Sequence, residues 1–316
     1  MRVFVAGATG AVGSRLTRLL VSSGHSVVGL TRTATKAEAI ERVGAEVSVA
    51  DALNRAALVA AVTGAKPDVI VHEMTAISAA NDLRRFDRSF AATNRLRSQG
   101  LDNLLAAAKQ AGTPRVIAQS FCGWPYACIG GPVKSEDDPL DPDPPPQMRQ
   151  SLAAIRYLEN GLTAAPDIAG LALRYGAFYG PGTGLFAGPV IDRLRRRRVP
   201  LIGGGNGWWS FVYVGDAAAA TAIAVERGAP GIYNIVDDEP APVREWLPAL
   251  AAMLGAKPPR HVPKWLARIA AGEHLVTLMT EARAGSNVKA KRRLGWQPDH
   301  ASWRRGFTEV LEVQTP

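Results

Sequence analysis

Short apolar runs alternate with segments of helical spacing through the first half of the chain. The apolar runs, which we predict to be β-strands, cover residues 2–6, 25–30, 45–49, 67–72 and 114–119. Between them, apolar residues recur three and four positions apart, as at Leu101, Leu104, Leu105 and Ala108. This alternation predicts an α/β fold, with a parallel sheet covered by helices on both faces.

The second half of the chain follows a different pattern. Residues 136–146 are acidic and contain five prolines, which excludes a helix or a central strand and predicts a loop leading to a helix that begins near Met148. After residue 180 the alternation loosens. We therefore predict a first domain over residues 1–180 and a smaller substrate-binding or cap region over 181–316. Strands near 208–214 and 231–235 could return to the main sheet.

Three glycines stand between the first predicted strand and an amphipathic helix. Gly7 would allow a tight turn, Gly10 would let the backbone approach a pyrophosphate, and Gly13 would let the helix pack on the strand. The helix N-terminus would then offer free N–H groups to phosphate. This pattern predicts a dinucleotide-binding unit of a Rossmann-type, doubly wound sheet. The turn residues Thr9, Ala11 and Val12 are predicted to contact the cofactor as well.

The end of the second predicted strand indicates which cofactor binds. An acidic residue there would bind ribose hydroxyls and favour NAD, but residues 27–33 contain none. Arg32 and Lys36 follow instead, and Arg15 could reach over from the first helix. Since cations suit a 2′-phosphate, we predict NADP(H); the alternative is that Arg32 is a solvated loop charge.

Charge and cysteine content narrow the classes further. The formal net charge is +9, but no nucleic-acid motif accompanies it, and a phosphate-bearing cofactor or substrate would use the same charge. The basic run at 193–198 is interpreted as a solvated helix end. The two cysteines, Cys122 and Cys128, predict neither a disulfide framework nor a zinc site. With no apolar run long enough to span a membrane and no leader pattern, we expect a cytoplasmic protein without membrane or nucleic-acid partners.

Several further segments resemble the extended short-chain dehydrogenase/reductase family, which includes the NAD-dependent epimerase/dehydratases. Besides the glycine turn, the resemblance rests on Asn94 and on residues 173–182, 211–218 and 294–298. It implies that Asp51, with Ala52 beside it, contacts the adenine. It also implies that Glu73 and Thr75 pass the cofactor ribose, that Tyr175 and Phe178 lie near the nicotinamide, and that the protein could be a homodimer.

One departure from this family concerns its catalytic Tyr and the Lys four residues later. None of the six tyrosines has a lysine at that spacing, and Met148 and Leu152 occupy the expected positions. Ser120 matches the family serine that bonds the reacting oxygen, unless it only bonds its own loop backbone. Tyr126 is a candidate substitute acid. Trp124, Trp208 and Trp209 could either wall an apolar pocket or fill the core.

Three functions fit these residues. The first is an NADP(H)-dependent oxidoreductase that reduces a small carbonyl, enone or imine with an atypical proton donor. It would suit a substrate that needs little acid catalysis. The second is a redox-neutral epimerase or dehydratase that holds NADP tightly. The third is a protein that senses NADP(H) without turnover.

Overall fold

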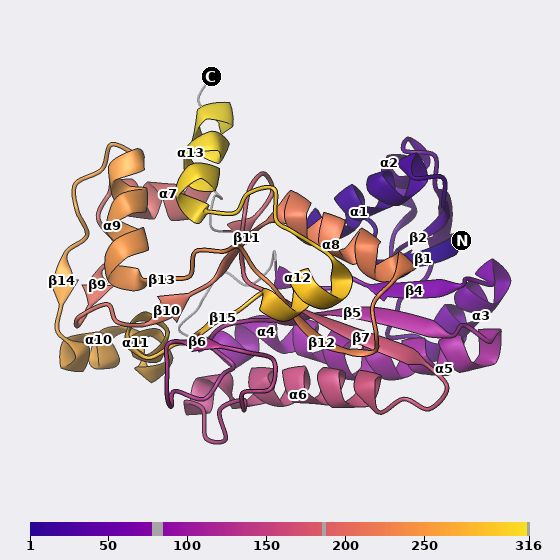
Figure 1. The fold of residues 1–316 in the computed structure, drawn as a ribbon, viewed down its shortest axis with the longest axis horizontal. Coiled ribbons are helices and arrows are strands. Elements are labelled where there is room, and N and C mark those ends of the chain that lie inside the picture. Colours follow the sequence, from indigo (N-terminus) through magenta and orange to yellow (C-terminus); the bar gives the residue numbers. More distant parts are fainter. Residues whose placement is uncertain (78–84, 185–187, 315–316) are drawn as a thin grey trace.

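The computed structural model describes residues 1–77, 85–184 and 188–314, and its centre is a seven-stranded parallel sheet (Figure 1). The strand order is β12-β7-β5-β4-β1-β2-β3. The strands are β1 (Arg2–Ala6), β2 (Ser26–Thr31), β3 (Glu46–Val49), β4 (Val69–His72), β5 (Arg115–Phe121), β7 (Ala169–Tyr175) and β12 (Gly231–Ile235). The chain order reverses between β1 and β4, and ligands of doubly wound sheets bind at the carboxyl ends of strands at such a point.

Helices cover both faces of this sheet (Figure 1). One face carries α1 (Ala11–Ser22), α2 (Ala37–Glu41) and α8 (Val214–Glu226). The other carries α3 (Arg55–Ala65), α4 (Phe86–Arg95), α5 (Leu101–Ala111) and α6 (Arg149–Thr163). A short π-helix, η4 (Leu96–Gly100), joins α4 to α5, and the 3-10 turn η1 (Ala34–Lys36) precedes α2. The predicted doubly wound α/β fold is therefore confirmed.

A smaller lobe of short strands and helices lies beside one end of the sheet (Figure 1). Its helices are α7 (Gly188–Arg195), α9 (Val243–Met253), α10 (Lys264–Ala271), α11 (Glu273–Thr280) and α13 (Trp303–Gln314). Its strands pair in twos and include β8 (Ala177–Tyr179), β9 (Leu201–Ile202), β10 (Trp208–Trp209), β11 (Phe211–Tyr213), β13 (Ala241–Pro242) and β14 (His261–Val262). Phe211, Trp246, Trp303 and Phe307 form the centre of its core.

The two strands expected to return to the sheet behave differently. β12 pairs with β7 in the seven-stranded sheet, in parallel. β11 instead pairs with β8, because Gly176 ends the register of β7 and turns the chain toward Ser210, whose carbonyl accepts from the amide of Ala177 (2.8 Å). The segment near 208–214 thus contributes to two separate two-stranded ladders, β10 with β13 and β11 with β8, contrary to that expectation.

The proline-rich segment behaves as predicted from its composition. It follows the two-residue strand β6 (Val133–Lys134), which pairs with β15 (Ala284–Gly285), and contains turns and bends up to the 3-10 turn η5 (Pro146–Met148). α6 then begins at Arg149, while α12 (Val288–Leu294) packs near β12. Within the described ranges, no helix is both long and apolar enough to cross a membrane.

Candidate functional site

The glycine turn closes tightly between β1 and α1. Gly7 has φ +99°, in the left-handed region, and a Cβ there would lie 2.6 Å from the carbonyl oxygen of Glu73. A Cβ on Gly13 would lie 2.1 Å from the carbonyl oxygen of Gly7. Neither position can hold a side chain unless the backbone moves, so both glycines are required by the packing of the turn.

The first turn of α1 is open to an anion. Its N-cap is Gly10, which supplies no capping side chain, and no acidic residue stands in the first turn. Thr9 and Ala11 are partly exposed beside it, whereas Val12 packs into the core. Uncapped N–H groups at a helix N-terminus bind phosphate well, so this turn fits a dinucleotide pyrophosphate.

Cations gather around the far end of β2. Arg32 and Lys36 are both exposed there. Arg15 is held more closely, since its guanidinium donates to the carbonyl oxygens of Ala11 (2.7 Å) and Pro181 (2.8 Å). A hollow between α1 and α2 is also lined by Arg18, a cation that the sequence analysis missed although it follows Ser14 by one helical turn.

The next candidates lie after β3 and β4. Asp51 is exposed, and its Oδ1 accepts the amide of Leu53 (3.0 Å). Ala52 is buried, and its carbonyl accepts from the side chain of Asn103 (2.9 Å). Thr75 is partly exposed. Asp51 and Thr75 are therefore accessible to a cofactor, whereas Ala52 is buried and takes part in a hydrogen bond through its backbone carbonyl.

Glu73 and Tyr175 lie deeper than the family resemblance implied. Glu73 is buried beneath the glycine turn, where its Oε1 accepts from the Tyr175 hydroxyl (2.8 Å) and its Oε2 has no hydrogen-bond partner among the described residues. The same hydroxyl lies 2.6 Å from the Thr221 hydroxyl, and Phe178 packs against the Tyr175 ring. Burial raises the pKa of Glu73 to about 8, so this carboxyl is mainly protonated at neutral pH.

Ser120 belongs to a buried polar network that crosses three strands. Strand register places Ser120 on β5 beside Arg174 on β7, and Arg174 beside Asn234 on β12. The Ser120 hydroxyl donates to Oε1 of Glu159 on α6 (2.6 Å). Arg174 donates to both oxygens of Glu159 (2.7 Å each) and to the Tyr126 hydroxyl (2.9 Å), which donates to Oδ1 of Asn234 (2.8 Å). All five side chains are at most 5% exposed.

This network bears on both catalytic candidates. Ser120 bonds a carboxylate 39 residues away, not its own loop backbone. Tyr126 is fully buried, and burial raises the pKa of its phenol far above the ordinary value, which argues against a role as substitute acid. Sequence analysis overlooked Arg174, Glu159 and Asn234. The available signal was a carboxylate at Glu159 on the apolar face of an amphipathic helix.

The positions expected for the family pair are apolar and buried. Met148 packs with Phe86 and Leu278, and Leu152 is fully buried. Ser151, between them, donates to Asp87 (2.6 Å) and accepts from Asn94 (3.1 Å). No proton donor is therefore available from Met148 or Leu152.

His72 does not supply an acid either. Its Nε2 lies 3.1 Å from the carbonyl oxygen of Leu96, and its Nδ1 accepts the amide of Met74 (3.2 Å). Burial lowers the pKa of His72 to about 4, so the imidazole is neutral. His72 therefore links β4 to η4 as a neutral side chain.

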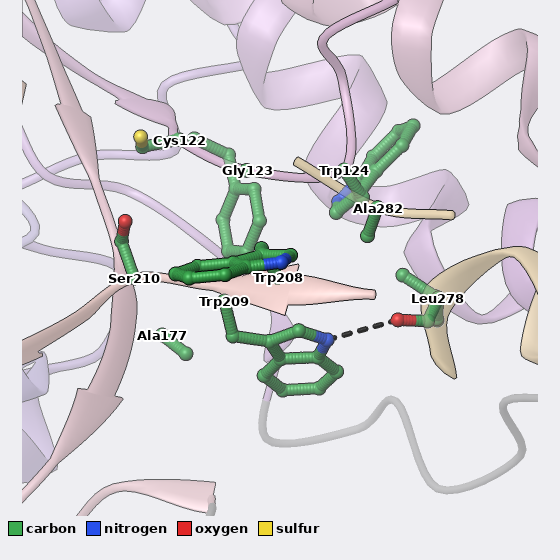
Figure 2. A pocket seen from close by; sticks show the side chains of 10 residues that line it. Cys122, Gly123, Trp124, Ala177, Trp208, Trp209, Ser210, Leu278 and Ala282 are labelled. Atoms are coloured by element: carbon green, nitrogen blue, oxygen red, sulfur yellow. Dashed lines mark hydrogen bonds between the residues drawn. The ribbon is translucent and has the colours of Figure 1, made fainter. Parts of the chain in front are cut away.

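An aromatic pocket opens at the carboxyl end of β5 (Figure 2). It has a cavity volume of about 40 Å³, is partly open to solvent, and is lined by Phe121, Cys122, Gly123, Trp124, Ala177, Trp208, Trp209, Ser210, Leu278 and Ala282. Trp209 is fixed by a hydrogen bond from its indole nitrogen to the carbonyl oxygen of Leu278 (2.9 Å). Burial raises the pKa of the Cys122 thiol, which makes it a poor nucleophile. The tryptophans considered in the sequence do line a pocket.

Comparison with known proteins agrees with this geometry. The family model described as "NAD dependent epimerase/dehydratase family" matches residues 3–236. This chain belongs to the NAD-dependent epimerase/dehydratase family. The resemblance inferred from the sequence is thereby confirmed.

One curated relative of this chain is 3-diazoavenalumate denitrifying reductase from Streptomyces sp, with 44% identity over 97% of this chain and 99% of the relative. Another is 4-hydroxy-2-methyl-3-oxo-4-farnesyl-3,4-dihydroquinoline-1-oxide ketoreductase from Stigmatella aurantiaca, with 29% identity over 94% of this chain and 92% of the relative. Because both of these relatives are named as reductases, they support an oxidoreductase function for this chain.

Solved structures match the fold over almost the whole chain. UDP-glucose 4-epimerase from Thermotoga maritima, solved with UDP-glucose, superposes with a TM-score of 0.76 at 22% identity, covering 99% of this chain and 98% of that one. UDP-glucose 4-epimerase from Thermus thermophilus, solved with NAD, gives a TM-score of 0.73 at 24% identity, covering 99% and 98%. At these identities the likeness shows the fold alone.

Proposed function

We propose that this protein is an NADP(H)-dependent reductase that acts on an acceptor already activated for hydride attack. The observation that carries the proposal is the contrast between two halves of one site. The glycine turn and the N-terminus of α1 are built to hold a dinucleotide. The positions of the family acid hold Met148 and Leu152, and the substitute candidate Tyr126 is fully buried.

The residues of the turn fit the cofactor. Gly7 and Gly13 let the turn close, and Gly10 leaves the N-terminus of α1 without a capping side chain, which suits the pyrophosphate. Exposed Arg32 and Lys36 at the end of β2, and Arg18 on α1, suit a 2′-phosphate. Exposed Asp51 suits the adenosine end. When bound, NADPH would supply the hydride, and the protein would orient it toward the carboxyl end of β5.

Two observations support this acceptor class: the apolar, buried side chains of Met148 and Leu152, and the name of the Streptomyces relative, which describes a reductase that denitrifies a diazo compound. A diazonium carbon that receives hydride forms one C–H bond. Its C–N bond breaks, and the bonding pair leaves with dinitrogen. The step oxidises one NADPH to NADP⁺ and takes up no proton. A ketone would require a proton at oxygen, which Met148 and Leu152 cannot donate.

The test uses NADPH deuterated at the nicotinamide C4, with benzenediazonium as acceptor. We expect one N₂ and one NADP⁺ per benzene formed, with deuterium on the ring carbon. The rate without enzyme is subtracted, and Gly13→Ala serves as a variant with an obstructed turn. Consumption of NADPH with ketones but not with the diazonium salt would contradict the proposed acceptor. Tight NADP(H) binding without consumption of any acceptor would support the redox-neutral or sensing alternatives.

A further inference from the structure

We propose that the aromatic pocket binds a planar aromatic substrate and excludes nucleotide sugars. This inference deepens the proposed function, since it names the substrate class of the same site, and it rests on that function for the reaction. Its evidence is the kind, the charge and the position of the side chains around the pocket.

Aromatic rings from two separate segments wall the pocket (Figure 2). Phe121 and Trp124 come from the end of β5, with ring centroids 6.3 Å apart, and Phe86 packs edge-on against Trp124 (5.4 Å). Trp208 and Trp209 come from β10, whose partner is β13. Offset and edge-to-face contacts between rings are favourable, so walls of this kind select a flat aromatic ligand.

Trp209 gives the wall its rigidity. Its indole N–H donates a hydrogen bond to the carbonyl oxygen of Leu278. The centroid of its ring lies 4.9 Å from that of Trp246 in the core of the smaller lobe. A ligand that stacks here therefore meets a surface that is already ordered, and it loses little affinity to the ordering of side chains.

The lining lacks the charge that a diphosphate requires. Among the described residues that line the pocket, none is charged. The basic run at the end of α7 does not contribute, since its exposed arginines lie outside the lining: Arg193, Arg195, Arg196 and Arg198. Burying a diphosphate without cations or matched donors is costly, so a nucleotide sugar does not fit this chemistry.

The position of the pocket suits hydride transfer. β5 is two strands from β1 in the sheet, and both carboxyl ends lie at the same edge. Two strand spacings amount to about 10 Å, so the wall of the pocket at Phe121, at the end of β5, lies laterally within the span of a dinucleotide from the glycine turn. An aromatic ring in the pocket would therefore lie near the nicotinamide end of the cofactor.

The experiment measures binding and needs no turnover. Full-length protein saturated with NADP⁺ is titrated calorimetrically with 2-naphthol, which carries no diazo group, and separately with UDP-glucose. We expect 2-naphthol to bind and UDP-glucose not to. Trp208→Ala should weaken 2-naphthol binding about tenfold or more, while Trp265→Ala, on exposed α10, should leave it unchanged.

Folding is controlled by thermal melting and by NADP⁺ affinity. If Trp208→Ala melts early, Trp208→Phe, which keeps a ring, should fold and retain most of the affinity. Displacement of 2-naphthol by UDP-glucose, or unchanged affinity in the folded Trp208→Ala variant, would overturn the inference. Since 2-naphthol cannot accept hydride, its binding does not depend on whether the protein reduces a diazo compound. A failure of the binding test and a failure of the proposed diazo reduction can therefore be told apart.

Discussion

The Ser120 hydroxyl donates to Oε1 of Glu159 across 2.6 Å, and Arg174 donates to both oxygens of the same carboxylate. Both ends of the segment that carries Phe121 and Trp124 are therefore fixed, because Ser120 precedes it and Tyr126 follows it in the same network. We interpret Ser120 and Tyr126 as positioning residues for the wall of the aromatic pocket.

This network should stabilise the protein unequally at its two main contacts. Ser120→Ala removes one donor and leaves the Arg174–Glu159 ion pair, so we expect a loss of about 1–2 kcal/mol in the free energy of unfolding. Glu159→Ala leaves the buried guanidinium of Arg174 unpaired and should cost about 3–5 kcal/mol. Urea denaturation of both variants measures the difference. Equal, small losses would show that the ion pair is not the centre of the network.

Removing the hydroxyl of Tyr126 distinguishes a positioning role of this residue from a role as the catalytic acid. If Tyr126 donated the proton, Tyr126→Phe would lower kcat by about 100-fold or more. Among the described residues the fully buried hydroxyl bonds only Arg174 and Asn234, so we expect kcat to fall less than tenfold, with the pH profile of kcat unchanged. Tyr157→Phe, at a half-exposed hydroxyl on α6, is the matched control. A hundredfold loss confined to Tyr126→Phe would restore it as the acid.

Glu73→Gln should change how stability depends on pH. The ordinary pKa of this carboxyl is 4.5, and burial raises it to about 8 in the folded protein. The folded state therefore keeps a proton that the unfolded chain releases, so this stabilisation is present below pH 4.5 and is lost as pH rises toward 8.

A glutamine does not titrate, so the stability of Glu73→Gln relative to the natural protein should increase between pH 5 and pH 8, by about 3 kcal/mol. Denaturation with urea at both pH values measures this change. Glu38→Gln, whose carboxylate is exposed on α2, is the control and should show no such trend. A constant difference for Glu73→Gln would mean that Glu73 is ionised in the fold.

The glycine turn can be tested by two substitutions of the same kind. In Gly13→Ala the new Cβ would lie 2.1 Å from the carbonyl oxygen of Gly7, so we expect NADPH affinity to fall at least tenfold and stability by about 2 kcal/mol. Gly64→Ala, on α3, meets no atom within 4 Å and should stabilise the helix by about 0.5–1 kcal/mol. Equal effects of the two would contradict a packed turn.

Cofactor preference depends on Arg32 in our proposal. Arg32→Ala should weaken NADPH binding about tenfold and leave NADH binding nearly unchanged, because only NADPH carries the 2′-phosphate. Fluorescence titration with both cofactors measures this change. Arg195→Ala, at an exposed cation on α7, controls for net charge. Parallel losses for both cofactors would assign Arg32 to another part of the site.

Local patterns predicted the framework of this fold well. The five strands expected from apolar runs all occur, because a strand buried on both faces needs continuous apolar residues, and the glycine turn needs small residues at fixed spacing. The site was harder to predict. Ser120, Arg174 and Asn234 are neighbours only through strand register, and that register pairs residues 54 and 60 positions apart, which no local pattern encodes. The aromatic pocket depends likewise on the pairing of β10 with β13.

The position of β12 at the edge of the sheet sets the order in which the protein can mature during synthesis. Until Gly231–Ile235 has left the ribosome, β7 is the edge strand of the sheet and its unpaired backbone groups are exposed. The hydrogen bond between Tyr126 and Asn234 cannot form before then either. An exposed apolar edge is prone to pair with other chains. A nascent or truncated chain ending near residue 180 is therefore expected to be prone to aggregation, because β12 from the later half of the chain is what covers this edge of β7.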